Sequence, residues 1–213
     1  MSKDFVKSWS TKEKVSTSQG LTGRLRRVPL KDRLMKTIYG LNNVQQTLEH
    51  SRLNMEQKHK ALFSKCLHAQ ETKDMQTAVM YANECAQVKK IVQTIVTSQL
   101  SLEQVGLRLE TVADFGDIAA EILPAASVVR SVKGRLSGVI PEVSMQLGTI
   151  SSTLDSLMLE AGEATGQSWN VLSSGEDAEK ILAEAATIAE QKVKEGFPDL
   201  PSTSSAQGGV NSP

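Results

Sequence analysis

The sequence predicts an all-α protein: a long antiparallel helical hairpin, shorter C-terminal helices that fold back on it or extend from it, and flexible termini. Three observations support this prediction. Aromatic residues make up only 4% of the 213 residues, which suits long helices packed through narrow seams better than a thick globular core. No proline lies between Pro29 and Pro124, so long helices can run without interruption. Two apolar seams with helical spacing also lie on either side of residue 70.

The first long helix is predicted over residues 29–69. Pro29 suits the first turn of a helix, because a backbone N–H would have no partner there. An apolar residue then recurs every seven positions, which is typical of a helix that packs along a coiled-coil seam. These seam residues are Leu34, Leu41, Leu48, Met55 and Leu62. At 1.5 Å per residue, the helix is expected to be about 60 Å long.

A second long helix is predicted after a short polar stretch at residues 71–74. Its seam alternates steps of three and four residues without a slip. The seam consists of Ala78, Tyr81, Cys85, Val88, Val92, Ile95, Gln99, Leu102, Gly106, Leu109 and Ala113. Two helices of matched length joined by a short turn predict an αα-hairpin over residues 29–115. Gln99 and Gly106 place no large apolar side chain in the seam, and they mark a place where the helix could bend.

Shorter helices are predicted over residues 117–162, which complete a helical core with the hairpin. Pro124 and Pro141 bracket a short helix, and an amphipathic helix follows Pro141. Residues 162–175 are rich in Gly and Ser and are expected to form a linker.

The two ends of the chain are expected to be flexible. Residues 1–28 are polar and basic and form a predicted arm. Residues 163–213 combine the linker, an acidic helix over 176–195 and a polar tail that is expected to be disordered.

Charge divides the chain into a basic front and an acidic back. Residues 1–70 hold 14 Lys and Arg against 5 Asp and Glu, and the remaining 143 residues hold 10 against 19. This asymmetry predicts an anionic surface as the partner of the front half. It also allows the two halves to attract each other, and salt would weaken that attraction.

The residues indicate neither an enzyme nor a cofactor. Cys66 and Cys85 lie on the apolar seams and are expected to be buried, free thiols in a reducing cytosol. His50, His59 and His68 are nine residues apart, so His59 faces away from the other two and the three cannot share a metal. The sequence has no Walker loop, G-x-S-x-G or H-E-x-x-H motif. It also has no run of 18 apolar residues, so we expect a cytoplasmic protein that is peripheral at the membrane.

Residues 73–84, with the sequence Lys-Asp-Met-Gln-Thr-Ala-Val-Met-Tyr-Ala-Asn-Glu, resemble the start of the second helix of ESCRT-III proteins. A Gly-Asn/Asp-Met pattern commonly opens that helix, and Lys73 stands where the glycine is frequent. Residues 100–112 resemble its later part, and the likeness extends over about 24–160. Among ESCRT-III proteins, the chain is most similar to archaeal CdvB-type cell-division paralogues, without the winged-helix tail that some of them carry.

The resemblance implies a filament-forming protein that remodels or cuts membranes, in archaeal cell division, with no enzymatic activity of its own. The implied partners are itself, paralogous ESCRT-III subunits, an anionic membrane surface and an AAA ATPase of the Vps4 or CdvC type. The residues expected to face lipid headgroups are Arg24, Arg26, Arg27, Lys31, Arg33 and Lys36. Phe5 and Trp9, four residues apart, either insert as an interfacial anchor or pack on the body of the protein.

The segment Phe197-Pro198-Asp199-Leu200-Pro201 resembles the tail motif that docks on the MIT domain of that ATPase. Its proline stiffness would lower the cost of ordering it in a groove between helices. The predicted docking residues are Phe197, Pro198, Leu200 and Pro201. A plain linker is the alternative interpretation of this segment.

Two other functions are compatible with the same composition. A static coiled-coil adaptor would bridge proteins without contacting membranes. A basic helical protein that associates with nucleic acid would bind phosphate through charge, although no DNA- or RNA-binding signature is present and no specific nucleic-acid partner is expected.

Overall fold

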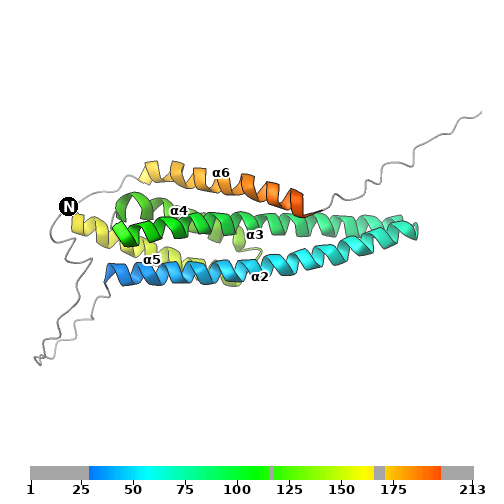
Figure 1. The fold of residues 1–213 in the computed structure, drawn as a ribbon, viewed down its shortest axis with the longest axis horizontal. Coiled ribbons are helices and arrows are strands. Elements are labelled where there is room, and N and C mark those ends of the chain that lie inside the picture. The colour runs from blue at the N-terminus through cyan, green and yellow to red at the C-terminus, as the bar shows by residue number, and fades with distance from the viewer. Residues whose placement is uncertain (1–28, 116–117, 166–170, 198–213) are drawn as a thin grey trace, which may run out of the picture.

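The computed structural model describes residues 29–115, 118–165 and 171–197. Within these ranges the chain is built from helices without strands, as the sequence predicted (Figure 1). The helices are α2 (Leu30–Glu71), α3 (Met75–Phe115), α4 (Ile118–Leu136), α5 (Pro141–Thr165) and α6 (Val171–Gly196). The predicted basic arm and the tail beyond residue 197 lie outside the described residues.

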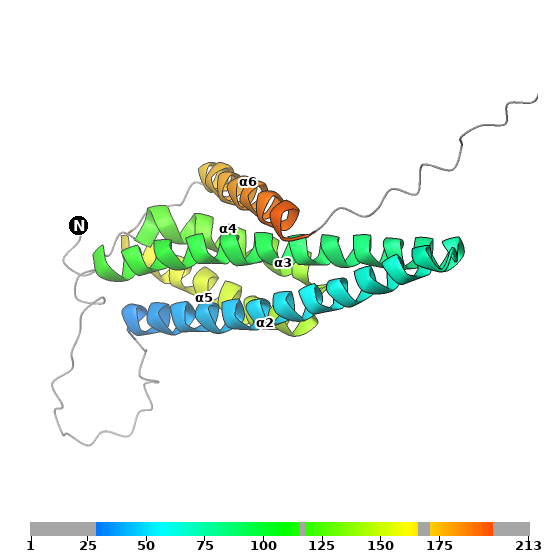
Figure 2. The ribbon, with the colours of Figure 1, turned by 45° about the vertical axis from the view of Figure 1, so that its right-hand side comes forward.

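The predicted hairpin is confirmed, and the shorter helices fold back on it. α2 packs along α3, and the hairpin tip projects beyond the other helices (Figure 1). At the opposite end, α4 packs on α3, and α5 packs on both α4 and α2. These four helices therefore close into a bundle. α6 lies outside this bundle, against α3 and α4, and crosses the hairpin obliquely (Figure 2).

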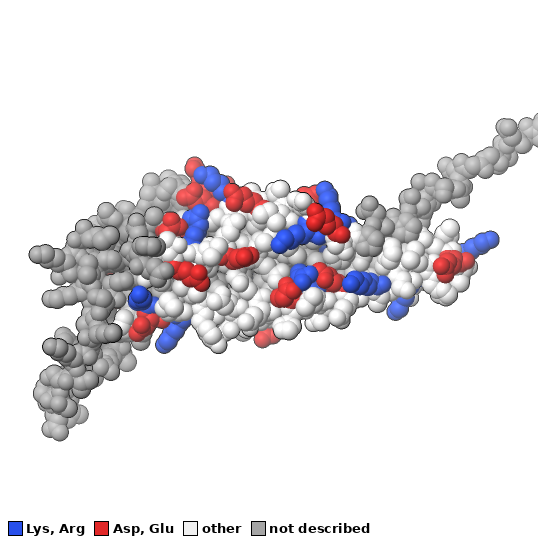
Figure 3. Space-filling model, in the orientation of Figure 1, with Lys and Arg blue, Asp and Glu red and all other residues white. Residues whose placement is uncertain are grey.

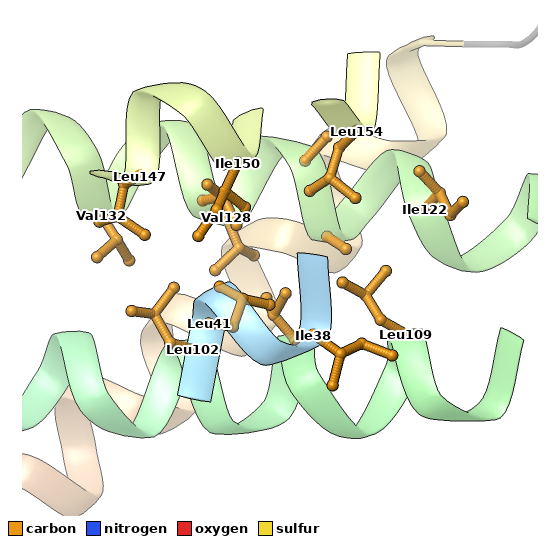
Figure 4. Packing of buried hydrophobic residues seen from close by; sticks show 14 of the residues in the cluster. Ile38, Leu41, Leu102, Leu109, Ile122, Val128, Val132, Leu147, Ile150 and Leu154 are labelled. Atoms are coloured by element: carbon orange, nitrogen blue, oxygen red, sulfur yellow. The ribbon is translucent and has the colours of Figure 1, made fainter. Parts of the chain in front are cut away.

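The predicted seams form the centre of this bundle. Leu41, Leu102 and Leu109 are fully buried and face apolar side chains of α4 and α5 (Figure 4). Each buried leucine stabilises the fold by about 1.5–3 kcal/mol relative to an exposed one. Met55 and Leu62 are only partly buried, because they lie where α5 no longer covers α2.

At the hairpin turn, Lys73 adopts a backbone conformation that glycine favours. Lys73 has a φ of 62°, in the left-handed region that L-residues avoid. Asp74 caps the start of α3, because its Oδ1 accepts a hydrogen bond of 3.1 Å from the Thr77 N–H. The hydrogen bonds from the Thr77 hydroxyl and amide hold the pKa of Asp74 below its usual value. The turn is therefore defined by backbone geometry and a cap, and it does not require glycine.

We expect Lys73→Gly to raise the free energy of unfolding by about 0.5–1 kcal/mol, because glycine adopts a positive φ without steric cost. Urea denaturation measures the change. Lys58→Gly, at an exposed position inside α2, is the control and should lower stability by about 1 kcal/mol. A loss of stability in Lys73→Gly would contradict the strain assigned to this turn.

Two helix boundaries differ from the prediction. α4 begins at Ile118 and continues through Pro124, whereas the sequence predicted a start after this proline. Pro124 cannot donate a hydrogen bond to the carbonyl one turn earlier, but Ile122 and Ala125 beside it are buried in the core, and this packing outweighs the lost bond. α6 likewise begins at Val171, five residues before the predicted start, and includes Gly175.

Candidate functional site

The first three turns of α2 present two exposed lysines and exposed apolar side chains, together with the exposed Asp32. Lys31 and Lys36, two of the predicted lipid-contacting residues, are exposed. Between them in the helical register lie Met35 and Tyr39, which are 50% and 69% exposed. The spacing of three and four residues places these four side chains on one side of the helix. This face combines cations with an aromatic ring, which is the composition of an interfacial helix surface.

Met35 and Tyr39 were not predicted as site residues. A signal was present in the sequence, because each follows a buried seam residue, Leu34 and Ile38, and therefore lies off the seam. Large apolar side chains on the solvent side of a helix are informative only when they cluster. Met35 and Tyr39 form such a cluster on the side of α2 that faces away from its buried residues.

Arg33 differs from the neighbouring lysines because it faces α5. Its Nη1 donates a hydrogen bond of 2.7 Å to Glu160 Oε2, and the arginine side chain is only 25% exposed. α2 and α5 approach closely here, since a Cβ at Gly40 would lie 3.4 Å from Ile150 Cδ1. Arg33 therefore connects the basic helix to the acidic part of the chain in this conformation.

The predicted division of charge along the chain does not appear as two separate patches on the face of the described residues that Figure 3 shows. Figure 3 shows Lys and Arg interspersed with Asp and Glu over the visible face. Residues 1–28 hold seven Lys and Arg against two Asp and Glu, so more than half of the basic excess belongs to the predicted arm. Arg24, Arg26 and Arg27, with the predicted anchor residues Phe5 and Trp9, lie outside the described residues.

Phe197, the first residue of the predicted docking segment, packs against the hairpin. It follows α6 directly, is 6% exposed, and its N–H donates a hydrogen bond of 3.1 Å to the Val193 carbonyl. Its ring meets the ring of His59 on α2 at 4.5 Å between centroids, nearly perpendicular. Pro198, Leu200 and Pro201 lie outside the described residues.

A polar cluster occupies the hairpin where the second seam is thinned. Gln99 Nε2 donates a hydrogen bond of 3.0 Å to Glu49 Oε2, and Arg52 Nη2 lies 2.5 Å from Glu49 Oε1. The hydrogen bonds from Arg52, and then from Gln99, lower the pKa of Glu49 to about 2. α3 continues through Gln99 and Gly106 as one helix. Gln99 therefore replaces an apolar contact with a hydrogen bond between α3 and α2.

The cysteines lie as the sequence predicted, and the histidines divide into one that is buried and two that are exposed. Cys66 and Cys85 are buried and free, and the buried His59 lies apart from the exposed His50 and His68. In the described part of the chain, no cluster of three His, Cys, Asp or Glu side chains could bind a metal ion. None of the helices described there combines the length and apolar character needed to cross a bilayer.

These features define a helical-hairpin protein whose shorter helices fold back on the hairpin and whose helix α2 carries exposed lysines beside exposed apolar side chains. Three curated proteins of Sulfolobus acidocaldarius are similar to it in sequence. Cell division protein B1 is 38% identical over 207 residues, which cover 97% of this chain and 94% of that protein. Cell division protein B is 29% identical over 178 residues, covering 84% of this chain and 68% of that protein.

The third relative, Cell division protein B3, is 26% identical over 117 residues, which cover 55% of this chain and 68% of that protein. No family model matches the chain, and no solved structure matches it. The near full-length likeness to Cell division protein B1 shows that this chain belongs to the cell division protein B family. The resemblance to CdvB-type ESCRT-III proteins is thereby confirmed at the level of the family.

Proposed function

We propose that this chain is a subunit of a membrane-remodelling polymer that acts in cell division. The observation that carries the proposal is the 38% identity to Cell division protein B1 over nearly the whole chain. The subunit associates with further copies and with paralogues of its family at the division site. It acts by assembly on a lipid surface, without chemistry of its own.

The membrane contact is made by the basic arm and by the exposed face of α2. Lys31 and Lys36 lie against anionic headgroups, where each basic residue contributes about 1 kcal/mol. Tyr39 is 69% exposed and its ring lies at headgroup depth, as aromatic side chains prefer. Arg33 joins this surface when its ion pair with Glu160 opens. Membrane contact thereby favours separation of α5 from α2.

The tail connects the polymer to its ATPase. Phe197, Pro198, Leu200 and Pro201 dock in an extended conformation on an MIT domain, and the ATPase disassembles the polymer by pulling on the tail. The support for this step is the likeness of the segment to the family's docking motif and its place directly after α6.

Sedimentation with vesicles that contain anionic phospholipid tests the membrane contact. We expect Lys31→Gln/Lys36→Gln to weaken binding about 30-fold at low salt, since two contributions of about 1 kcal/mol are lost, and less at high salt. Lys58→Gln/Lys60→Gln is the matched control, because it removes the same charge about 33 Å further along α2. Equal losses in the two variants, or no binding of the unmodified protein, would reject this face as the lipid contact. Electron microscopy of the sedimented vesicles then shows whether a polymer forms, which a static adaptor would not do.

The docking step is tested separately with the full chain and an isolated MIT domain of the ATPase. Leu200→Asp is expected to abolish binding, because a carboxylate cannot enter an apolar groove without a partner. Val210→Asp adds the same charge elsewhere in the tail and is expected to leave binding unchanged. Retained affinity in Leu200→Asp would exclude this segment as the docking site.

A further inference from the structure

The contact between Phe197 and His59 connects the end of α6 to the first arm of the hairpin. The two rings pack edge to face, with their centroids 4.5 Å apart and their planes at 83°, which is a favourable aromatic geometry. Both side chains are buried, Phe197 with 6% of its surface exposed and His59 with 3%. His59 is separated from Phe197 by most of the chain, so the contact depends on α6 being folded back.

This contact belongs to a small apolar cluster that is distinct from the core of the bundle. α3 contributes three valines and α6 contributes two small side chains, and α2 supplies apolar residues that are partly buried. The members are Val88, Val92, Val96, Ala189, Val193 and Phe197, with Met55, Leu62 and Leu100 packed against them. Because Phe197 is the largest side chain that the α6 segment places in this cluster, it fastens the end of α6 to the hairpin.

His59 lies in this cluster as a buried polar group. Among the described residues, none forms a hydrogen bond or an ion pair with its imidazole. Its other ring neighbour is Phe63, stacked at 6.3 Å between centroids. Burial, together with the positive charge of Lys89 on α3, lowers the pKa of His59 below its usual value.

No described carboxylate forms an ion pair with His59, although charged residues surround the cluster. On α2, Glu56 forms an ion pair with Arg52. On α6, Lys192 lines the cavity of about 380 Å³ beside Phe197. The charged residues that line this cavity are Glu49, Arg52, Glu56, Glu103 and Lys192. Of these charged groups, Lys89 on α3 acts on His59 with a positive charge, while Glu49 and Glu56 are paired with Arg52.

We propose that His59 and Phe197 form a proton-sensitive clasp: the neutral imidazole holds Phe197 and α6 against the hairpin, and protonation of His59 releases them. An imidazolium at this position would be buried, would form no ion pair with a described carboxylate, and would be repelled by the cation of Lys89. When α6 leaves, the imidazole becomes solvated and accepts a proton at its ordinary affinity. Acidification therefore favours the form in which α6 is undocked.

The pH range of the clasp follows from the linkage between proton binding by His59 and docking of α6. Well above the ordinary histidine pKa of about 6.5, His59 is neutral in both forms and the docked form has its full stability. Below that value the undocked form binds a proton that the docked form does not, so docking weakens as the pH falls toward the lowered pKa of His59. A single proton changes the docking equilibrium by at most tenfold per pH unit.

The clasp does not rest on the proposed membrane or ATPase function, because it concerns only the docking of α6. If Phe197 also enters an MIT domain, the same side chain must first leave His59. The availability of the tail to that partner would then depend on pH.

Proton NMR of the full chain tests the clasp directly, because the sequence holds only three histidines. We expect His59 to titrate below the ordinary histidine pKa of about 6.5. Phe197→Ala should shift the titration of His59 upward toward that value. The proposal is overturned if Phe197→Ala leaves the titration of His59 unchanged, or if His59 titrates above pH about 6.5, which would mean that the imidazolium is attracted to the phenyl ring.

Hydrogen exchange of the α6 amides supplies the second measurement, with rates corrected for the intrinsic effect of pH. We expect α6 to lose protection between pH 7.5 and 5.5 while α2 and α3 retain theirs. His59→Gln and His59→Leu, which do not titrate, should remove this pH dependence even if either of them changes the protection itself. His50→Gln should retain the dependence. A pH-dependent loss of α6 protection that persists in both His59 variants would reject the clasp.

Discussion

Leu109→Ala is expected to lower the free energy of unfolding by about 2–5 kcal/mol, the range for a buried leucine whose cavity does not collapse. Leu109 is fully buried on α3 and lies in the layer of side chains between the hairpin and α4 (Figure 4). Its removal weakens both the seam of the hairpin and the attachment of the folded-back helices. Urea denaturation followed by circular dichroism measures the loss.

Leu107→Ala is the matched control, since Leu107 lies two residues away on the same helix and is 60% exposed. Its effect is expected to stay within about 0.5 kcal/mol. Similar losses in the two variants would mean that α3 does not bury the face assigned to it. That result would contradict the arrangement of the four-helix bundle.

Ala189→Leu is expected to detach α6 from the hairpin while the hairpin remains folded. Ala189 is fully buried in the cluster that α6 shares with α3, so a leucine with three more carbon atoms is expected to displace the side chains packed around it. Overpacking of this kind costs about 1–3 kcal/mol, which corresponds to a roughly 5–150-fold rise in the undocked population. Hydrogen exchange should show faster exchange throughout α6.

The control for this variant is Ala183→Leu, at an exposed position of the same helix, where leucine adds volume toward solvent. It is expected to leave the exchange rates of α6 unchanged apart from local effects. If Ala189→Leu also accelerates exchange in α2 and α3, the hairpin depends on α6 for its stability. The two parts would then open together, and α6 could not act as a separate element.

The sequence predicted the elements that depend on periodicity, because a regular seam constrains every residue of a long helix at once. Leu34, Leu41 and Leu48 recur at seven-residue intervals, and all three are buried. The predicted starts of α4 and α6 were wrong because proline and glycine usually mark helix ends, and Pro124 and Gly175 were interpreted in that way. Both lie inside helices, where contacts made elsewhere along the helix outweigh the local cost.

The candidate site was predicted only as far as single residues could reveal it. Lys31 and Lys36 are exposed as a lipid contact requires, and composition was enough to select them. The pairing of Arg33 with Glu160 joins residues 127 positions apart, so no local pattern encodes it. The contact of His59 with Phe197 depends equally on the fold, because neither residue alone indicates the other.

The projecting end of the hairpin holds both thiols of the chain between only two helices. Cys66 Sγ donates a hydrogen bond of 3.4 Å to the Ala78 carbonyl, and burial raises the pKa of the Cys85 thiol. A thiol reagent reacts with the thiolate, so it can reach these side chains at an appreciable rate only after the arms separate. The rate at which the thiols of the unmodified chain are labelled therefore reports how often α2 and α3 separate at the hairpin tip. It distinguishes a subunit that opens by releasing α5 or α6 from one whose hairpin itself comes apart.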